Sequence, residues 1–245
     1  MHDIRYDEIH DEFVVNNPFA QAILTFRGGA QGDEPPLRII QGPKTQLSDA
    51  SRLTIDPVHE EIYVPGGGGR ILVFPRTASG DVAPVRIITS PEMRTAGSLA
   101  VDPVHNLLIV GSGGGGDATR SGRKPVAKLL MFDRTANGST MPKSIIQGSN
   151  TGLTFIAQLE VNPAKGWIVV PQQGDDSSLP EQEGVFVGVW SIEDNGNVPP
   201  RWMLTGPKSG LKKPRGIGLD PKHKELIIPD MTLNSVLVFS FPEIF

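Results

Sequence analysis

The sequence contains no cysteine. This absence excludes thiol catalysis, thiolate zinc sites and disulfide bonds, and it leaves the redox compartment of the protein open. Long apolar runs are also missing, because no stretch approaches the about 18–20 apolar residues that a membrane-spanning helix requires. The first residues, MHDIRYDEIHDE, lack the basic and apolar regions of a signal peptide, so we expect that any export signal was removed or was never present.

An excess of positive charge is absent as well. The chain carries 23 Lys and Arg against 27 Asp and Glu, for a formal net charge of −4. The densest basic cluster consists of Arg120, Arg123, Lys124 and Lys128, within one loop. Because a nucleic-acid-binding domain concentrates basic residues on one face, we expect neither a nucleic-acid partner nor a polybasic membrane patch.

Glycine and proline are abundant, and one segment recurs five times. The chain has 28 Gly and 22 Pro, a composition typical of short strands joined by many turns. LTIDPVHEEIYV (53–64) is matched by IRYDEIHDEFVV (4–15), LAVDPVHNLLIV (99–110), LEVNPAKGWIVV (159–170) and IGLDPKHKELII (217–228). A second apolar run follows each copy, at 22–26, 70–74, 128–132, 187–192 and 235–239. Four copies add a third run after a glycine-containing turn, at 35–40, 83–88, 141–146 and 199–204.

This arrangement predicts an all-β fold. Four short strands in every 40–60 residues or so is the repeat pattern of a β-propeller blade. We therefore predict a single β-propeller domain, residues 1–245, with five recognisable four-stranded repeats and five or six blades. The repeats span about 4–52, 53–98, 99–158, 159–216 and 217–245.

The last copy lacks its fourth strand, since the chain ends at SVLVFSFPEIF. A propeller closes by pairing a strand from one terminus with the last blade, and three residues before the first strand are too few for that. Three explanations stay open. The chain is a piece of a longer propeller, another chain supplies the strand, or PEIF turns back.

The most conspicuous polar motif, His59-Glu60-Glu61, belongs to the repeat. His10, His59, His105 and His223 occupy one column, and Lys165 fills it in the fourth copy. Each follows an Asp or Asn in the tight turn between the first two strands, where that side chain hydrogen-bonds the backbone. A residue needed once per blade serves the turn, whereas a catalytic base is needed once per protein.

Without these histidines and without cysteine, the chain lacks the residues of a Ser-His-Asp or Cys-His site. The sequence therefore favours a non-enzymatic protein without excluding an enzyme. Any enzymatic site has to use carboxylates, amides, Arg or Lys, with a hard cation such as Ca²⁺ as the one cofactor to consider.

The stretch GIGLDPKHKELIIPDMTLNSVLVF (216–239) resembles the repeat of NHL-type or TolB-type six-bladed propellers. GDVAPVRIITSPEMRTAG (80–97) and GSTMPKSIIQGSNTGLTF (138–155) resemble linkers of bacterial extracytoplasmic members of that group. The resemblance implies a periplasmic, secreted or cell-surface location, although it does not exclude the cytoplasm. The group contains scaffolds, ligand binders and gluconolactonase-like lactonases, so the resemblance leaves function open.

A lactonase of that group is expected to hold its divalent cation on Glu, Asn and Asp residues at the channel mouth. The matching side chains here are Glu160 on a predicted inner strand, Asn16 or Asn17 after the second strand of copy one, and Asp230 in copy five. The resemblance therefore makes Glu160, Asn16 and Asp230 a candidate Ca²⁺ site.

The loops between second and third strands are the least repetitive parts of the chain, and such loops carry propeller sites. They contain acidic residues in one loop and basic residues beside a glycine run in another, neither in a known cation or phosphate motif. The candidate ligand or partner face comprises Asn17, Arg120, Arg123, Lys124, Gln172, Asp175, Asp176, Glu181 and Glu183.

The unfinished last copy also suggests an interface. An unpaired edge strand can accept a strand from a partner, here along Val236, Val238, Phe239 and Phe241. We therefore favour a scaffold or protein-interaction module that is a subunit of a larger assembly with protein partners. The alternatives are a cation-dependent lactonase-type hydrolase and a small-ligand or glycan binder.

Overall fold

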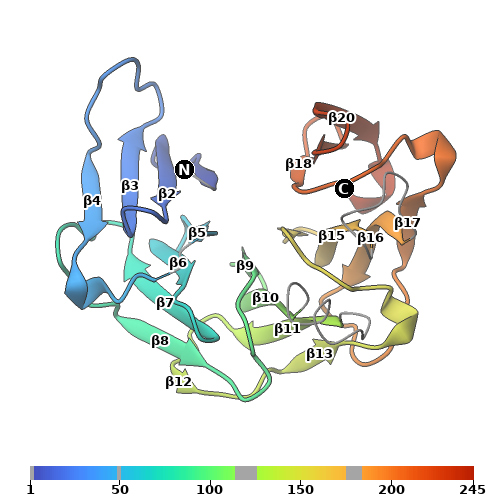
Figure 1. The fold of residues 1–245 in the computed structure, drawn as a ribbon, viewed down its shortest axis with the longest axis horizontal. Helices are drawn as coiled ribbons and strands as arrows, with labels where there is room; N and C mark the ends of the chain where they lie inside the picture. Colours follow the sequence, from blue (N-terminus) through green and yellow to red (C-terminus); the bar gives the residue numbers. More distant parts are fainter. Residues whose placement is uncertain (1–2, 49–50, 114–125, 175–183) are drawn as a thin grey trace.

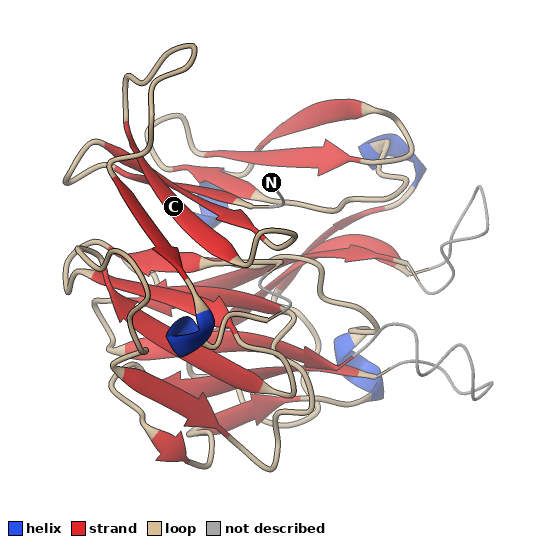
Figure 2. Cartoon of the chain, turned by 60° about the vertical axis from the view of Figure 1, so that its left-hand side comes forward, coloured by secondary structure: helices blue, strands red, loops and turns tan. Residues whose placement is uncertain are grey.

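A computed structural model describes residues 3–48, 51–113, 126–174 and 184–245. The chain folds into five antiparallel sheets arranged as the blades of a β-propeller, as the repeat predicts. Figure 1 shows the first strands near the centre and the fourth strands on the outside. It also shows an opening between the first and the last blade, while Figure 2 shows the chain turned by 60° about the vertical axis.

The first four blades each have the predicted four strands. Blade 1 consists of β1 (Ile4–Asp7), β2 (Glu12–Asn17), β3 (Ala22–Arg27) and β4 (Arg38–Gln41). Blade 2 consists of β5 (Thr54–Asp56), β6 (Glu61–Pro65), β7 (Arg70–Pro75) and β8 (Arg86–Thr89). Blade 3 consists of β9 (Ser98–Asp102), β10 (Leu107–Gly113), β11 (Ala127–Asp133) and β13 (Ser144–Ile146). Blade 4 consists of β14 (Glu160–Asn162), β15 (Trp167–Gln173), β16 (Val185–Ser191) and β17 (Trp202–Thr205).

Blade 5 has three strands, β18 (Gly218–Asp220), β19 (Glu225–Asp230) and β20 (Ser235–Ser240). The predicted absence of a fourth strand is confirmed. The tail turns back as a short 3-10 helix, η4 (Pro242–Ile244), and the side chain of Ile244 is fully buried. The amide of Asn162 in blade 4 donates to the carbonyl of Ile244 at 2.8 Å. The tail therefore seals the boundary between blades 4 and 5 and leaves the outer edge of β20 unpaired within the described chain.

The hydrophobic core lies between neighbouring blades. Side chains alternate between the two faces of a strand, and in an interior blade such as blade 3 nearly every residue of β10 and β11 is buried. Four clusters of buried apolar residues join blade 1 to 2, 2 to 3, 3 to 4 and 4 to 5. Within the described residues, no such cluster joins blade 5 to blade 1.

The glycine-containing turns also connect the blades. Gly80, Gly138 and Gly196 have φ of 83°, 71° and 82°, a region that costs other residues strain. Gly80 donates its N–H to the carbonyl of Ile39 at 2.6 Å, and Gly196 donates to Ile145 at 2.6 Å. The third turn forms β12 (Gly138–Ser139), which pairs in parallel with β8 of the preceding blade. Each turn thus fastens its blade to the outer strand before it.

Three further 3-10 helices follow outer strands in the linkers, η1 (Pro43–Thr45), η2 (Ser149–Thr151) and η3 (Pro207–Ser209). No helix in the described part of the chain is long and apolar enough to cross a membrane.

Candidate functional site

The repeated histidines lie in the turns, as the sequence predicts. In blade 3, one carboxylate oxygen of Asp102 accepts the backbone N–H groups of Val104 and His105 at 3.0 and 2.9 Å. The other oxygen lies 2.8 Å from Nδ1 of His105. The same Asp–His contact occurs in blades 1, 2 and 5, at 2.9, 2.8 and 2.7 Å. The histidines therefore stabilise turns.

Glu160 lies on the inner strand of blade 4 and forms an ion pair with Arg5 of blade 1 across the centre of the ring. Arg5 also donates through Nε to the carbonyl of Leu53 at 3.1 Å. Burial raises the pKa of Glu160 above its ordinary value, and attraction to Arg5 opposes that rise. The carboxylate of Glu160 is thus committed to a guanidinium in this structure.

The other two residues of the candidate cation site also contact protein atoms. Asn16 is fully buried, and its Oδ1 accepts the N–H of Asp3 at 2.7 Å. Asp230 accepts four backbone N–H groups, from Lys212 and Lys213 at 2.8 Å and from two residues of its own turn at 3.1 Å. These contacts hold linkers and turns in place. None of these contacts tests cation binding, so the cation site of Glu160, Asn16 and Asp230 stays a prediction.

The channel mouth carries a basic group that sequence reasoning missed. Arg52 donates through Nε to the carbonyl of Ala157 at 3.0 Å. Burial lowers the pKa of Arg52, and repulsion from Arg215 and Arg5 acts in the same direction, whereas Asp3 opposes it. The guanidinium group of Arg52 therefore lies close enough to those of Arg5 and Arg215 for their charges to interact. Their signal in the sequence was their position, in or just before the predicted inner strands of copies one, two and five.

Most of the predicted ligand or partner face lies outside the described residues, namely Arg120, Arg123, Lys124, Asp175, Asp176, Glu181 and Glu183. The other two members have local roles. Asn17 accepts the N–H of Ala20 at 3.2 Å in the turn after β2. Gln172 is fully buried and accepts the N–H groups of Thr154 and Phe155 at 3.2 and 3.3 Å, so it holds the linker to blade 4.

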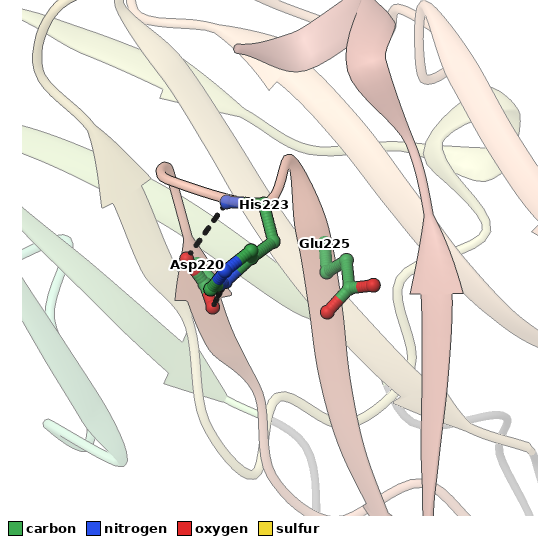
Figure 3. Close-up of side chains that lie close together, drawn as sticks. All are labelled: Asp220, His223 and Glu225. Carbon is green, nitrogen blue, oxygen red and sulfur yellow. Dashed lines mark hydrogen bonds and ion pairs between the residues drawn. The ribbon is translucent and has the colours of Figure 1, made fainter.

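Three side chains in blade 5 form a cluster of residue types that can ligate metals. Asp220, His223 and Glu225 place one ligand atom each within 4.8 Å of one another, and Figure 3 shows them at the turn between β18 and β19. His223 and Asp220 form the repeated turn contact. Hydrogen bonding to Asp220 raises the pKa of His223, and its charge attraction and that of Glu225 add to the rise. Such an exposed cluster is by itself no evidence for a metal ion.

The broadest feature that remains is the open side of the ring. On blade 5 the strand register puts Ile227, Val236 and Val238 on the face turned toward the opening, and they are 37%, 60% and 54% exposed. The matching positions in blade 2 are Tyr63 and its β7 neighbours, all fully buried against blade 3. The last blade thus exposes a surface of the kind that every preceding blade buries.

Blade 1 exposes the complementary surface. Its face toward the opening carries Ile4, Tyr6 and Ile39, which are 58%, 52% and 38% exposed, beside Phe13 and Leu24. The rings of Tyr6 and Phe13 lie 5.0 Å apart. The corresponding face of blade 2 belongs to the cluster shared with blade 1. Contiguous exposed apolar surface of this kind marks interaction sites in soluble proteins.

The predicted edge divides into two faces. Val236 and Val238 face the opening, whereas Phe239 and Phe241 are partly buried and pack against the cluster shared with blade 4. A hollow of about 330 Å³ lies between the outer strand of blade 4 and β20 and is lined by Met203, Leu204, Val238, Phe239, Ser240 and Phe241. This hollow adjoins the unpaired edge, where a fourth strand of blade 5 would pair. The tryptophans pack between blades, with Trp190 fully buried and Trp167 edge-on to Trp202 at 4.9 Å.

Comparisons with known proteins show the architecture. No protein-family model matches the sequence, and no curated protein matches it. A solved chain from a structure described as "Crystal Structure of Mitotic Checkpoint Complex" matches with a TM-score of 0.62 and 12% identity. The match covers 94% of this chain and 59% of that one, so this chain spans less than two thirds of its length. At this identity the likeness shows a propeller fold alone.

Proposed function

We propose that this propeller is a non-enzymatic protein-interaction module that binds another polypeptide along its open side. The observation that carries the proposal is the exposure of Val236 and Val238 on an unpaired edge strand. An unpaired strand presents N–H and C=O groups to a partner strand, and exposed apolar side chains beside it supply the buried contact area.

The proposal is also consistent with the contacts of the candidate site residues, whose polar side chains bind other parts of the protein. The turn histidines, Asp230 and Gln172 all make structural hydrogen bonds. Glu160 is paired with Arg5. The hydrolase and ligand-binding alternatives gain no observation of their own from these contacts. An NHL-type ancestry and an extracytoplasmic location remain proposals from the sequence resemblance.

The test is native mass spectrometry of the protein purified from its source, with matched valine substitutions. The edge variant carries Val236→Lys and Val238→Lys. The control carries Val58→Lys and Val104→Lys, at turn positions that are 59% and 68% exposed. We expect a complex with a second polypeptide that the edge variant loses and the control retains. A monomer in all three samples would contradict the proposal.

A further inference from the structure

Each boundary between blades contains one repeated pair of positions. The first member is the residue that begins the second strand of a blade. The second member, here called the closing residue, follows the third strand of the next blade. Closing residues are recognised by one shared hydrogen bond, from their N–H to the carbonyl just before the second strand of their own blade. They are Gly28, Arg76, Arg134, Ile192 and Phe241, with N–H···O distances of 2.6, 2.7, 3.0, 2.9 and 2.9 Å.

At the first two boundaries the pair is a carboxylate and a guanidinium. Arg76 of blade 2 lies 2.9 Å from Glu12 of blade 1, and Arg134 of blade 3 lies 2.8 Å from Glu61 of blade 2. A carboxylate removed from water needs such a partner, because an unpaired buried charge is strongly destabilising. Each Glu also forms an ion pair with an arginine on the outer strand of its own blade, which for Glu12 is Arg38.

At the next two boundaries both members of the pair are apolar. Leu107 of blade 3 and Ile192 of blade 4 belong to one buried cluster. Trp167 of blade 4 and Phe241 of blade 5 pack against the next cluster. At all four boundaries, therefore, the closing residue matches the chemistry of the residue it meets.

The fifth position in this series is Glu225, at the start of β19. No described Lys or Arg forms an ion pair with it, and a side-chain atom of each of Asp220 and His223 lies within 4.8 Å of its carboxylate (Figure 3). The same three residue types occur in blade 2 as Asp56, His59 and Glu61. There, Arg134 contacts both carboxylates, with its Nε 3.5 Å from Asp56. The cluster in blade 5 is thus the blade 2 arrangement without its guanidinium.

Blade 1 does not supply the missing cation. Its closing residue is Gly28, and a Cβ at that position would lie 1.8 Å from the side chain of Asp11. A second copy of this chain docking through its first blade would also bring Gly28, while Arg76 and Arg134 already serve Glu12 and Glu61. The occupant of the opening therefore differs from the first blade of this chain at the closing position.

We propose that the opening binds a β-blade of a separate polypeptide whose closing residue is arginine, and that this arginine pairs with Glu225 and Asp220. The inference rests on the proposed function and specifies its partner. The partner blade packs apolar side chains on Ile227, Val236 and Val238, and on its other side covers the exposed face of blade 1. It continues the series of boundaries with a third carboxylate–guanidinium pair.

The experiment uses the full chain with a defined probe. Residues 29–90, which contain the outer strand of blade 1, all of blade 2 and Arg76, are fused to the carboxyl terminus through a flexible Gly/Ser linker. A linker raises the effective concentration of the probe, so a weak contact is populated. One matched fusion carries Arg76→Glu in the added copy alone, and a second combines that change with Glu225→Arg. The readout is hydrogen exchange of the β20 amides, measured by mass spectrometry.

We expect the unmodified probe to slow exchange of the β20 amides at least about tenfold, the reversed charge to remove that protection, and the swapped pair to restore it. Equal protection by all three fusions would overturn the arginine rule and leave the open-edge function standing. Absence of protection in every fusion would overturn the blade-shaped site itself. The edge variants described above then decide the proposed function independently.

Discussion

Arg134 Nη1 lies 2.8 Å from Oε2 of Glu61, although the two residues are 73 positions apart and belong to different blades. The same guanidinium donates through Nε to Oδ1 of Asn106 at 3.0 Å, so its orientation is fixed from its own blade. Glu225 occupies the equivalent position on the last blade. Among the described residues, therefore, this position holds a carboxylate paired with arginine in blade 2 and one without an arginine partner in blade 5.

The paired and unpaired carboxylates should differ in their effect on stability. Glu61→Gln leaves Arg86 without its charged partner and Arg134 with Asp56 alone, and we expect a loss of about 3 kcal/mol in the free energy of unfolding. Glu225→Gln removes a half-buried carboxylate with no described Lys or Arg partner, so we expect a change within about 0.5 kcal/mol. Urea unfolding of both variants measures the difference. Equal losses would show that the open side is covered by the chain itself.

The Glu61 contribution should also depend on pH. Burial alone would raise the pKa of Glu61, but hydrogen bonds from Arg86 and Tyr63 outweigh burial and hold the pKa below its ordinary value of 4.5. A lowered folded-state pKa means that the stabilisation is present above the unfolded-state pKa and is lost as pH falls through the folded-state value. The stability difference between the wild-type protein and Glu61→Gln should therefore shrink below about pH 4. A difference that stays constant down to pH 3 would contradict this account.

The turn interpretation of the histidines predicts an asymmetry within one pair. Asp102→Ala leaves two backbone N–H groups without their acceptor, and we expect it to cost about 1–2 kcal/mol. His105→Ala keeps those two hydrogen bonds and should cost less than half as much. Thermal unfolding compares the two variants. A larger effect of the histidine substitution would mean that its ring has a role beyond the turn.

His223 should titrate above the ordinary histidine pKa of 6.5, because Asp220 hydrogen-bonds its ring and Glu225 adds negative charge. A raised folded-state pKa gives stabilisation that is complete below pH 6.5 and is lost as pH rises through the folded-state value. Glu225→Gln should move the pKa back toward 6.5. An NMR titration of the ring protons measures both values. An arginine docked at Glu225 should lower the pKa further, which the fusion with the added blade also tests.

The repeat made the fold predictable, because three strands recur in all five copies and the glycine turn with its fourth strand recurs in four of them. The inter-blade pairs were harder to predict. Glu61 and Arg134 share no segment, and their relationship becomes visible only when closing residues are aligned by a backbone hydrogen bond that the sequence does not display. The carboxylates of Asp230 and Glu160 show the opposite problem. A carboxylate is a suitable cation ligand, so both residues were candidates. The sequence does not reveal that backbone N–H groups already bind Asp230 and that Arg5 already pairs with Glu160.

The edge strand illustrates a further limit of the sequence. The run SVLVFSF predicts an apolar strand, and alternation separates its side chains onto two faces, but which face is covered depends on the neighbouring blade. In the structure Phe239 packs toward blade 4, whereas Val238 faces the opening. Tertiary packing, which the sequence does not specify locally, therefore decides which half of the predicted edge is available.

Lysine substitution at two equivalent valines tests whether that face is open in solution. Val73 in blade 2 and Val238 in blade 5 occupy the same strand position, but their exposed fractions are 0% and 54%. Val73→Lys would bury an unpaired charge, and we expect a loss of about 4 kcal/mol or more, or failure to fold. Val238→Lys lets the ammonium group reach water, so the unfolding free energy of the isolated chain should change by less than about 0.5 kcal/mol. Circular dichroism during urea unfolding measures both. A large loss at Val238 in the isolated monomer would mean that the ring closes on itself, and the opening would then be unavailable to a partner.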